Sequence, residues 1–320
     1  IMGLIQDKLE RVKELSRFCY NCSDCDTVCP TSLVELFRPR LFVRRLIDTE
    51  IDSFEDIFSQ ESLYNCLTCA LCSEHCPMSS EANGINIPEM IQILRDYGFE
   101  HDLLDKQLEA NKTHDGFTLL YPRLQSESDN WTNNMSFVTE DSQLKTQEQG
   151  EIGYFVGCYE SMEQKFEKYG VKYTDTAKSA IKILNHLGIT PVVLDTKCCG
   201  HDSYWAGDVK TAENLAKFNV QKLTKAGVKT VLVSCAEGYE MWKNNYPKIL
   251  KDSEVKCNYE VKHISEYIAD KQLIDKQKAK SKNKGKETVK VTYHDPCRLG
   301  RLGNVYDEPC QIFDFFLQRW

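Results

Sequence analysis

The sequence lacks any run of about 18 consecutive apolar residues, the length that a membrane-spanning helix needs. Residues 1–17 are studded with charge, so we expect no signal peptide either. Basic residues are not in excess: 40 lysines and arginines stand against 48 aspartates and glutamates, and the net charge is -8. This acidic balance argues against a nucleic-acid partner. We therefore expect a cytoplasmic protein without a membrane span of its own, which would associate with a membrane only through a partner.

Two nucleotide-binding fingerprints are missing as well, because the sequence contains no G-x-G-x-x-G motif and no phosphate-binding loop. Any flavin must therefore come from a partner protein. Cysteine, in contrast, is abundant, with 15 residues in a chain of 320. In an intracellular protein of this size, so many cysteines indicate metal ligands or redox groups rather than disulfides. Eight precede Pro77 and seven follow Gly157, which predicts two kinds of cysteine site.

The apolar pattern divides the chain into a helical first part and a second part in which strands and helices alternate. Residues 2–18 and the segment after Pro88 carry apolar side chains at helical spacing, and 33–60 also looks helical. The predicted strands of the second part are 152–158, 190–194, 229–234 and 289–294, with helices at 174–188 and 208–226. This alternation predicts a parallel α/β sheet. The polar residues 111–150 are interpreted as a linker.

The first eight cysteines form two runs, at 19–30 and 66–77, that share the spacing Cys-x2-Cys-x2-Cys-x3-Cys-Pro. This spacing is typical of bacterial ferredoxins with two [4Fe–4S] clusters, where three close thiolates bind one cluster and the fourth binds the other. The predicted ligands are Cys19, Cys22, Cys25 and Cys76 for the first [4Fe–4S] cluster and Cys66, Cys69, Cys72 and Cys29 for the second. The alternative is zinc, whose sites usually pair two Cys-x2-Cys units across a longer gap.

Four later cysteines, Cys158, Cys198, Cys199 and Cys235, each follow a predicted strand. Ligands of open parallel sheets gather at the carboxyl ends of the strands, so we expect these thiols to converge. Adjacent cysteines do not easily form an unstrained disulfide with each other, and Gly200 lets the backbone approach a bulky cofactor. From these residues alone, the site can hold a third iron–sulfur cluster, hold another metal or be empty.

Four short motifs stand in a fixed order: FVGC at 155–158, CCG at 198–200, VSCAEGY at 233–239 and HDPCRLG at 294–300. Together they resemble the cysteine-rich CCG-domain family. With the ferredoxin-type runs before them, they are similar to the D-type subunit of heterodisulfide reductases, which is equivalent to a fusion of the C-type and B-type subunits. They are also similar to the iron–sulfur subunits of glycolate and lactate oxidase systems.

The resemblance implies an α+β fold overall, with a mostly helical two-[4Fe–4S] ferredoxin domain followed by an α/β CCG domain with a parallel sheet. The expected limits are 1–110 for the ferredoxin-like domain, 111–150 for the linker and 151–288 for the CCG domain. Residues 289–320 resemble the start of a second, incomplete CCG module.

In the family, each CCG module carries five cysteines, and in heterodisulfide reductases it holds a noncubane [4Fe–4S] cluster that cleaves a disulfide. Cys158, Cys198, Cys199 and Cys235 match four of these positions, and Gly238 stands at the fifth. Four thiolates still suffice for an iron–sulfur cluster. No catalytic residue is assigned from the sequence.

We therefore expect an iron–sulfur electron-transfer subunit of a heterodisulfide reductase-like oxidoreductase complex, which passes electrons through two [4Fe–4S] clusters to a CCG centre that reduces a disulfide. One alternative is a non-catalytic relay subunit, which the glycine at position 238 favours. Another is the iron–sulfur subunit of a flavin-dependent glycolate or lactate oxidase. The expected partners are redox proteins, either a flavoprotein or a membrane cytochrome subunit, in an anaerobic cytoplasm.

Overall fold

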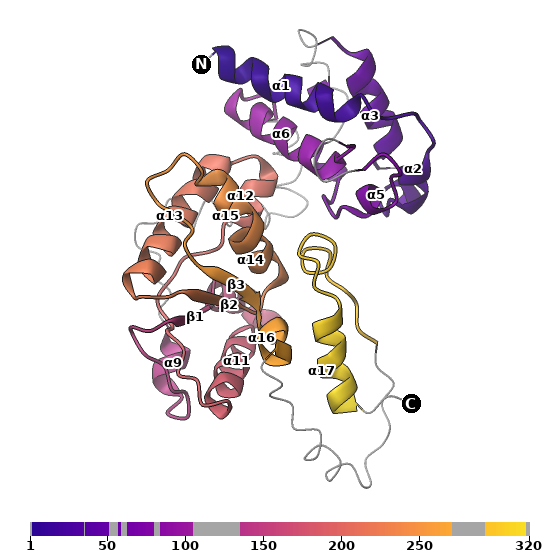
Figure 1. The fold of residues 1–320 in the computed structure, drawn as a ribbon. Coiled ribbons are helices and arrows are strands. Elements are labelled where there is room, and N and C mark those ends of the chain that lie inside the picture. The colour runs from indigo at the N-terminus through magenta and orange to yellow at the C-terminus, as the bar shows by residue number, and fades with distance from the viewer. Residues whose placement is uncertain are drawn as a thin grey trace. The chain divides into compact units, whose positions relative to one another are not determined.

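The computed structural model of the chain describes residues 2–34, 36–50, 57–58, 63–79, 84–104, 135–270 and 292–317. The chain forms two compact units (Figure 1). The first contains residues 1–128 together with 200–212, and the second contains 129–199 and 213–320. No helix in the described part of the chain is long and apolar enough to span a membrane.

The first unit is helical. Its helices are α1 (Met2–Ser16), α2 (Asp24–Val28), α3 (Pro39–Asp48), α5 (Leu71–Glu74), α6 (Ile87–Glu100) and α12 (His201–Ala206), with 3-10 turns η1 (Ser32–Val34) and η3 (Leu63–Asn65). Helix α1 packs on α3 and α6, and the core between them is formed by fully buried side chains such as Val12, Leu46, Met90 and Leu94. The start of α6 is fixed by Asn86, whose side-chain oxygen accepts a hydrogen bond from the Glu89 backbone amide at 3.2 Å.

The second unit contains a parallel sheet of three strands in the order β1 (Ile152–Phe155), β2 (Thr230–Val233) and β3 (Glu260–His263). Its helices are α9 (Ser136–Glu140), α10 (Tyr159–Phe166), α11 (Thr174–His186), α13 (Val209–Lys225), α14 (Ala236–Glu240), α15 (Tyr246–Ile249), α16 (Ile264–Asp270) and α17 (Asp307–Leu317), with a 3-10 turn η4 (Glu167–Tyr169) and a π-helical turn η5 (Met241–Asn245). The predicted fold class, a helical first domain before an α/β domain with a parallel sheet, is confirmed.

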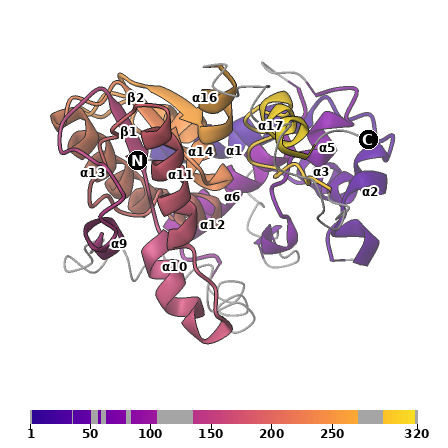
Figure 2. The same ribbon diagram turned by 90° about the horizontal axis from the view of Figure 1, so that it is seen from below.

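Alternate residues of a strand point to opposite faces of the sheet. In this sheet both faces are covered. Tyr154 and Leu232 pack with Ile181 of α11 and Tyr267 of α16 in one core. On the opposite face, the Phe155 ring meets the Trp242 ring of η5 with centroids 5.1 Å apart. Helices α9, α11 and α16 thus lie on one side, and α13, α14 and α15 on the other (Figures 1 and 2).

Two predicted strands differ from the structure. The expected strand 190–194 is reduced to isolated parallel bridges from Val192 to Gln147 and Gly153. In the expected strand 289–294, residues 292–294 are not in a strand, and 289–291 lie outside the described residues. The third strand is β3 instead. Strand β3 is an edge strand without a fully buried residue, so it lacks the apolar run from which a strand could be predicted.

The expected linker 111–150 is described only from residue 135 onward, and that part packs with the second unit. Phe137 and Leu144 are buried in the core that Tyr154 also joins. The polar composition around these two residues conceals their contribution to the core. Residues 200–212, expected in the second domain, group with the first unit. The domain limits stay a prediction.

Candidate metal centres

The two ferredoxin-type cysteine runs have the same backbone conformation. Asn21 and Thr68, each two residues after the first cysteine of its run, have φ values of 68° and 50°. Ser23 and Ala70, each directly after the second cysteine, have φ values of 79° and 63° and precede helices α2 and α5. Residues other than glycine rarely adopt this left-handed conformation. Its recurrence at equivalent positions indicates that each run wraps around a site of the same shape.

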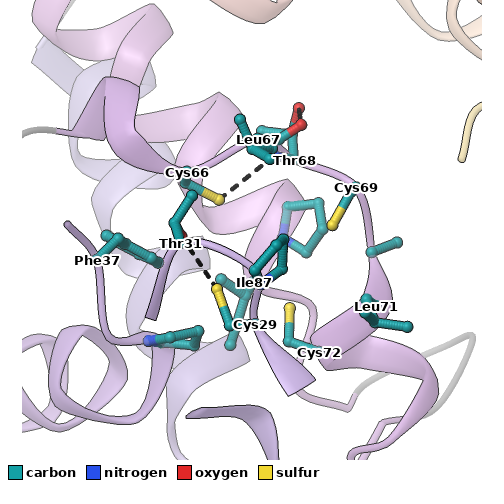
Figure 3. Close-up of a pocket in the computed structure, with 14 residues that line it drawn as sticks. Cys29, Thr31, Phe37, Cys66, Leu67, Thr68, Cys69, Leu71, Cys72 and Ile87 are labelled. Atoms are coloured by element: carbon teal, nitrogen blue, oxygen red, sulfur yellow. Dashed lines mark hydrogen bonds between the residues drawn. The ribbon is translucent and has the colours of Figure 1, made fainter. Parts of the chain in front are cut away.

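Cys29 of the first run joins three cysteines of the second run around one pocket. Cys29, Cys66, Cys69 and Cys72 all line it, and Figure 3 shows their sulfur atoms directed toward one another. This is the set predicted for the second cluster. The Thr68 backbone amide donates a hydrogen bond to the Cys66 sulfur at 3.4 Å, a contact that stabilises negative charge on a thiolate.

Cys76 of the second run lies with three cysteines of the first. Burial raises the pKa of the Cys25 thiol to about 12, and the nearby charges of Cys19, Cys76 and Cys22 act in the same direction. These four thiols are therefore within electrostatic reach of one another, as the predicted first set requires.

The two sets adjoin. The pKa of Cys72 is raised by burial, by the charges of Cys66 and Cys69 in its own set, and by the charge of Cys25 in the other. Burial disfavours a thiolate unless a positive charge compensates it, and a bound metal deprotonates its thiol ligands. Two converging sets of four thiols, most of them buried or half-buried, therefore fit two metal clusters side by side.

The second unit brings its four motif cysteines together at the carboxyl edge of the sheet. Cys158 and Cys235 follow the ends of β1 and β2, and Cys198 and Cys199 follow the bridge at Val192. The pKa of Cys199 is raised by a hydrogen bond with Cys198, by burial, and by the charges of Cys198, Cys235 and Cys158. Burial also raises the pKa of Cys235 to about 12. The donor set and its burial fit a third metal centre.

The backbone of the Cys198-Cys199 pair is held by two buried side chains. The Asn219 amide of α13 donates to the Cys198 carbonyl at 2.9 Å, and the Tyr246 hydroxyl of α15 donates to the Cys199 carbonyl at 3.0 Å. Asn219 also accepts a hydrogen bond from the Lys197 backbone amide at 2.8 Å. Sequence reasoning missed both side chains. The available signal was for Asn219 alone, a polar residue on the otherwise apolar face of the predicted helix 208–226.

Replacing Asn219 with leucine is expected to lower the free energy of unfolding by about 1–3 kcal/mol, because the Cys198 carbonyl and the Lys197 amide lose a buried partner. Denaturant unfolding measures the change. We also expect Cys198 and Cys199 to react faster with iodoacetamide, as peptide mapping reports. The matched control is Asn245→Leu, because the Asn245 amide bonds Glu240 instead. Equal thiol reactivity in the two variants would contradict a holding role for Asn219.

A group of hydroxyls lies beside Cys235. The Tyr154 and Tyr159 hydroxyls are 2.7 and 3.0 Å from the Ser234 hydroxyl, and burial raises the pKa of both tyrosines. His263 lies 3.3 Å from the Ser234 carbonyl, and burial lowers its pKa. These neighbours are therefore neutral near pH 7, so they hold the end of β2 in place without adding charge beside the thiols.

Gly238 faces the Cys235 side of this site. Its backbone amide lies 3.5 Å from the Cys235 sulfur as a hydrogen-bond donor. A Cβ atom at this position would lie 3.6 Å from the Cys235 Cβ and 3.1 Å from a methyl group of Val233. The position at which the family carries its fifth cysteine is thus next to the cysteine set, and here it supplies a backbone amide in place of a thiol.

The remaining candidate residues lie elsewhere. His201 is buried at the start of α12 in the first unit. Cys257 is half-buried beside the Tyr259 hydroxyl, and burial raises its pKa. Cys297 is half-buried in a turn, and Cys310 is half-buried on α17.

Two family models match this sequence. The model described as a 4Fe-4S dicluster domain matches residues 15–80, and the model described as a CCG cysteine-rich domain matches residues 152–239. The first match spans both ferredoxin-type runs and implies two [4Fe–4S] clusters there. The second spans the four thiols at the sheet edge. No solved structure matches the chain.

Curated relatives resemble the chain at low identity. The EtfAB:quinone oxidoreductase of Syntrophomonas wolfei is 29% identical over 267 residues, which cover 80% of this chain and 34% of that protein. An uncharacterized iron-sulfur protein of Methanococcus maripaludis is 28% identical over 98% of this chain and 57% of its own length. The D-type subunit of the dihydromethanophenazine:CoB–CoM heterodisulfide reductase of Methanosarcina mazei is 28% identical over 91% of this chain and 70% of its own. The chain thus spans between about a third and 70% of these relatives.

Proposed function

We propose that this chain, a CCG-domain iron–sulfur protein with a 4Fe-4S dicluster domain, is the electron-transfer subunit of a heterodisulfide reductase-like oxidoreductase. The observation that carries the proposal is the crossed arrangement of the two cysteine runs, in which Cys29 joins the second set and Cys76 the first. Clusters bound by four thiolates accept and release single electrons. The distant relationship to the D-type subunit of a heterodisulfide reductase supports the assignment to this class.

The proposed ligands are Cys19, Cys22, Cys25 and Cys76 for the first cluster, Cys29, Cys66, Cys69 and Cys72 for the second, and Cys158, Cys198, Cys199 and Cys235 for a third. In this proposal the third centre reduces a disulfide, which takes up two electrons and two protons and gives two thiols. The chain itself contributes the Asn219 and Tyr246 hydrogen bonds that hold the cysteine pair.

A relay role is the second candidate, and Gly238 favours it. The fifth thiol of the family motif is replaced by a backbone amide, so a cluster of the disulfide-cleaving kind lacks one of its usual ligands. In this alternative the chain passes single electrons from a flavoprotein to another redox protein. Its 29% identity with an EtfAB:quinone oxidoreductase agrees with such a role.

Iron and acid-labile sulfide per chain, measured after purification without oxygen, separate these functions. Electron paramagnetic resonance (EPR) of reduced and oxidised samples accompanies the analysis. About twelve irons and a signal on oxidation that responds to added thiol would support the disulfide reductase, since three clusters of four irons are then present. About eight irons, with only coupled signals on reduction, would favour the relay. About four irons or fewer would overturn both.

If the wild type contains about eight irons, the variant Gly238→Cys is expected to fill the third site, because its thiol would lie next to Cys235. We expect iron per chain to approach about twelve, together with a thiol-responsive signal on oxidation. Gly238→Ser is the matched control, since it fills the same space with a poorer ligand. Equal iron in both variants and in the wild type would show that position 238 does not limit the site.

A further inference from the structure

Arg95 of α6 is an almost fully buried arginine, with only 4% of its surface exposed. Its guanidinium donates hydrogen bonds to the carbonyls of Leu63, Cys66 and Trp205 at 2.5, 2.8 and 2.7 Å. The guanidinium carbon also lies 4.7 Å from the centre of the Tyr64 ring. Burying a charge is costly even when hydrogen bonds compensate, so this residue calls for a functional explanation.

The charge of Arg95 acts on the second cysteine set. The Arg95 guanidinium donates its 2.8 Å hydrogen bond to the carbonyl of Cys66 itself, so its positive charge is fixed beside that predicted ligand. Arg95 therefore stabilises negative charge at Cys66. Reduction of a cluster adds one negative charge to the same place, so the same interaction favours the reduced form.

The surroundings of the first set have the opposite sign. The negatively charged Asp26 directly follows Cys25 in the chain. Asp26 is itself paired with Arg40 at 3.4 Å, which moderates its effect. Cys22 is exposed to solvent, whereas Cys29 and Cys72 of the second set are buried. Burial alone would make the second cluster harder to reduce, because an apolar environment disfavours added charge.

We propose that Arg95 raises the reduction potential of the cluster held by Cys29, Cys66, Cys69 and Cys72 above that of its neighbour. An electron that a one-electron donor gives to the pair then settles on the second cluster, and the donor is oxidised by one electron. Arg95 is a positioning residue that acts through Cys66 rather than a ligand. This inference rests on the proposed electron-transfer function.

An EPR-monitored redox titration of the anaerobic protein tests the proposal with the variants R95Q and R95K. R95Q removes the charge, so the higher of the two potentials is expected to fall and the lower to stay. The ratio of reduced to oxidised cluster at a fixed potential should drop about tenfold, which corresponds to about 59 mV for one electron. R95K keeps the charge and should stay within about threefold of the wild type.

The matched control is R11Q, which removes the same charge from the same unit. Arg11 is half-exposed and pairs with Glu89 at 3.2 Å, so solvent screens it and both potentials should stay unchanged. The inference would be overturned if R95Q left both reduction potentials unchanged, shifted both equally or lowered only the lower one. If R95Q loses the second cluster, the R95K variant decides the test. R95K retains the positive charge, so a fall in the potential of the second cluster in R95K would also overturn the inference. A wild-type protein with about four irons or fewer would instead refute the proposed function.

Discussion

Alanine at Cys29 is expected to abolish the second cluster, and alanine at Cys76 the first, although each residue belongs to the other cysteine run. The crossed arrangement is the reason: Cys29 lines the pocket of Cys66, Cys69 and Cys72. Each variant should lose about half of the eight irons expected for two clusters. Iron and sulfide analysis of the anaerobically purified variants measures the loss.

The identity of the lost cluster comes from matched variants within the runs. The EPR spectrum of Cys29→Ala should resemble that of Cys69→Ala, and the spectrum of Cys76→Ala should resemble that of Cys22→Ala. An uncrossed arrangement predicts the reverse pairing, with Cys29→Ala resembling Cys22→Ala. That result would refute the ligand assignment, even in a wild-type protein that contains both clusters.

Much of the candidate site could be predicted from the sequence because covalent spacing determines it. Two-residue gaps keep three thiols of a run within reach of one metal cluster wherever the run lies. The motif cysteines after β1 and β2 follow from a similar argument, since parallel strands end at the same edge of a sheet. In both cases the signal is local, and long-range packing adds little to it.

The features that were missed depend on contacts between distant segments. Asn219 lies 21 residues from Cys198, whose carbonyl it binds, and Arg95 lies 29 residues from Cys66 and 110 from Trp205. A single polar residue in a helical pattern does not reveal which carbonyl it will meet. The edge strand β3 was missed for a related reason, because only its pairing with β2 makes it a strand.

Gly207→Ala is expected to destabilise the first unit strongly, because Gly207 lies against the backbone of α6, which is distant from it in the sequence. Its φ of +102° is a conformation that alanine rarely adopts, and a Cβ there would lie 2.3 Å from the Arg95 carbonyl oxygen. The carbonyl belongs to the backbone of α6 and cannot move aside without disturbing that helix. We expect a loss of more than about 3 kcal/mol in the free energy of unfolding, because strain and overpacking add.

Gly170→Ala is the matched control for this prediction. Gly170 also has a positive φ, +69°, but nothing lies within 4 Å of the added Cβ. Only the conformational strain remains, so the loss should be about 1–2 kcal/mol. Denaturant unfolding of both variants, with iron retained, measures the difference. Similar losses would mean that α12 does not pack against α6 as closely as described, and the hydrogen bond from Arg95 to Trp205 would then lose its support.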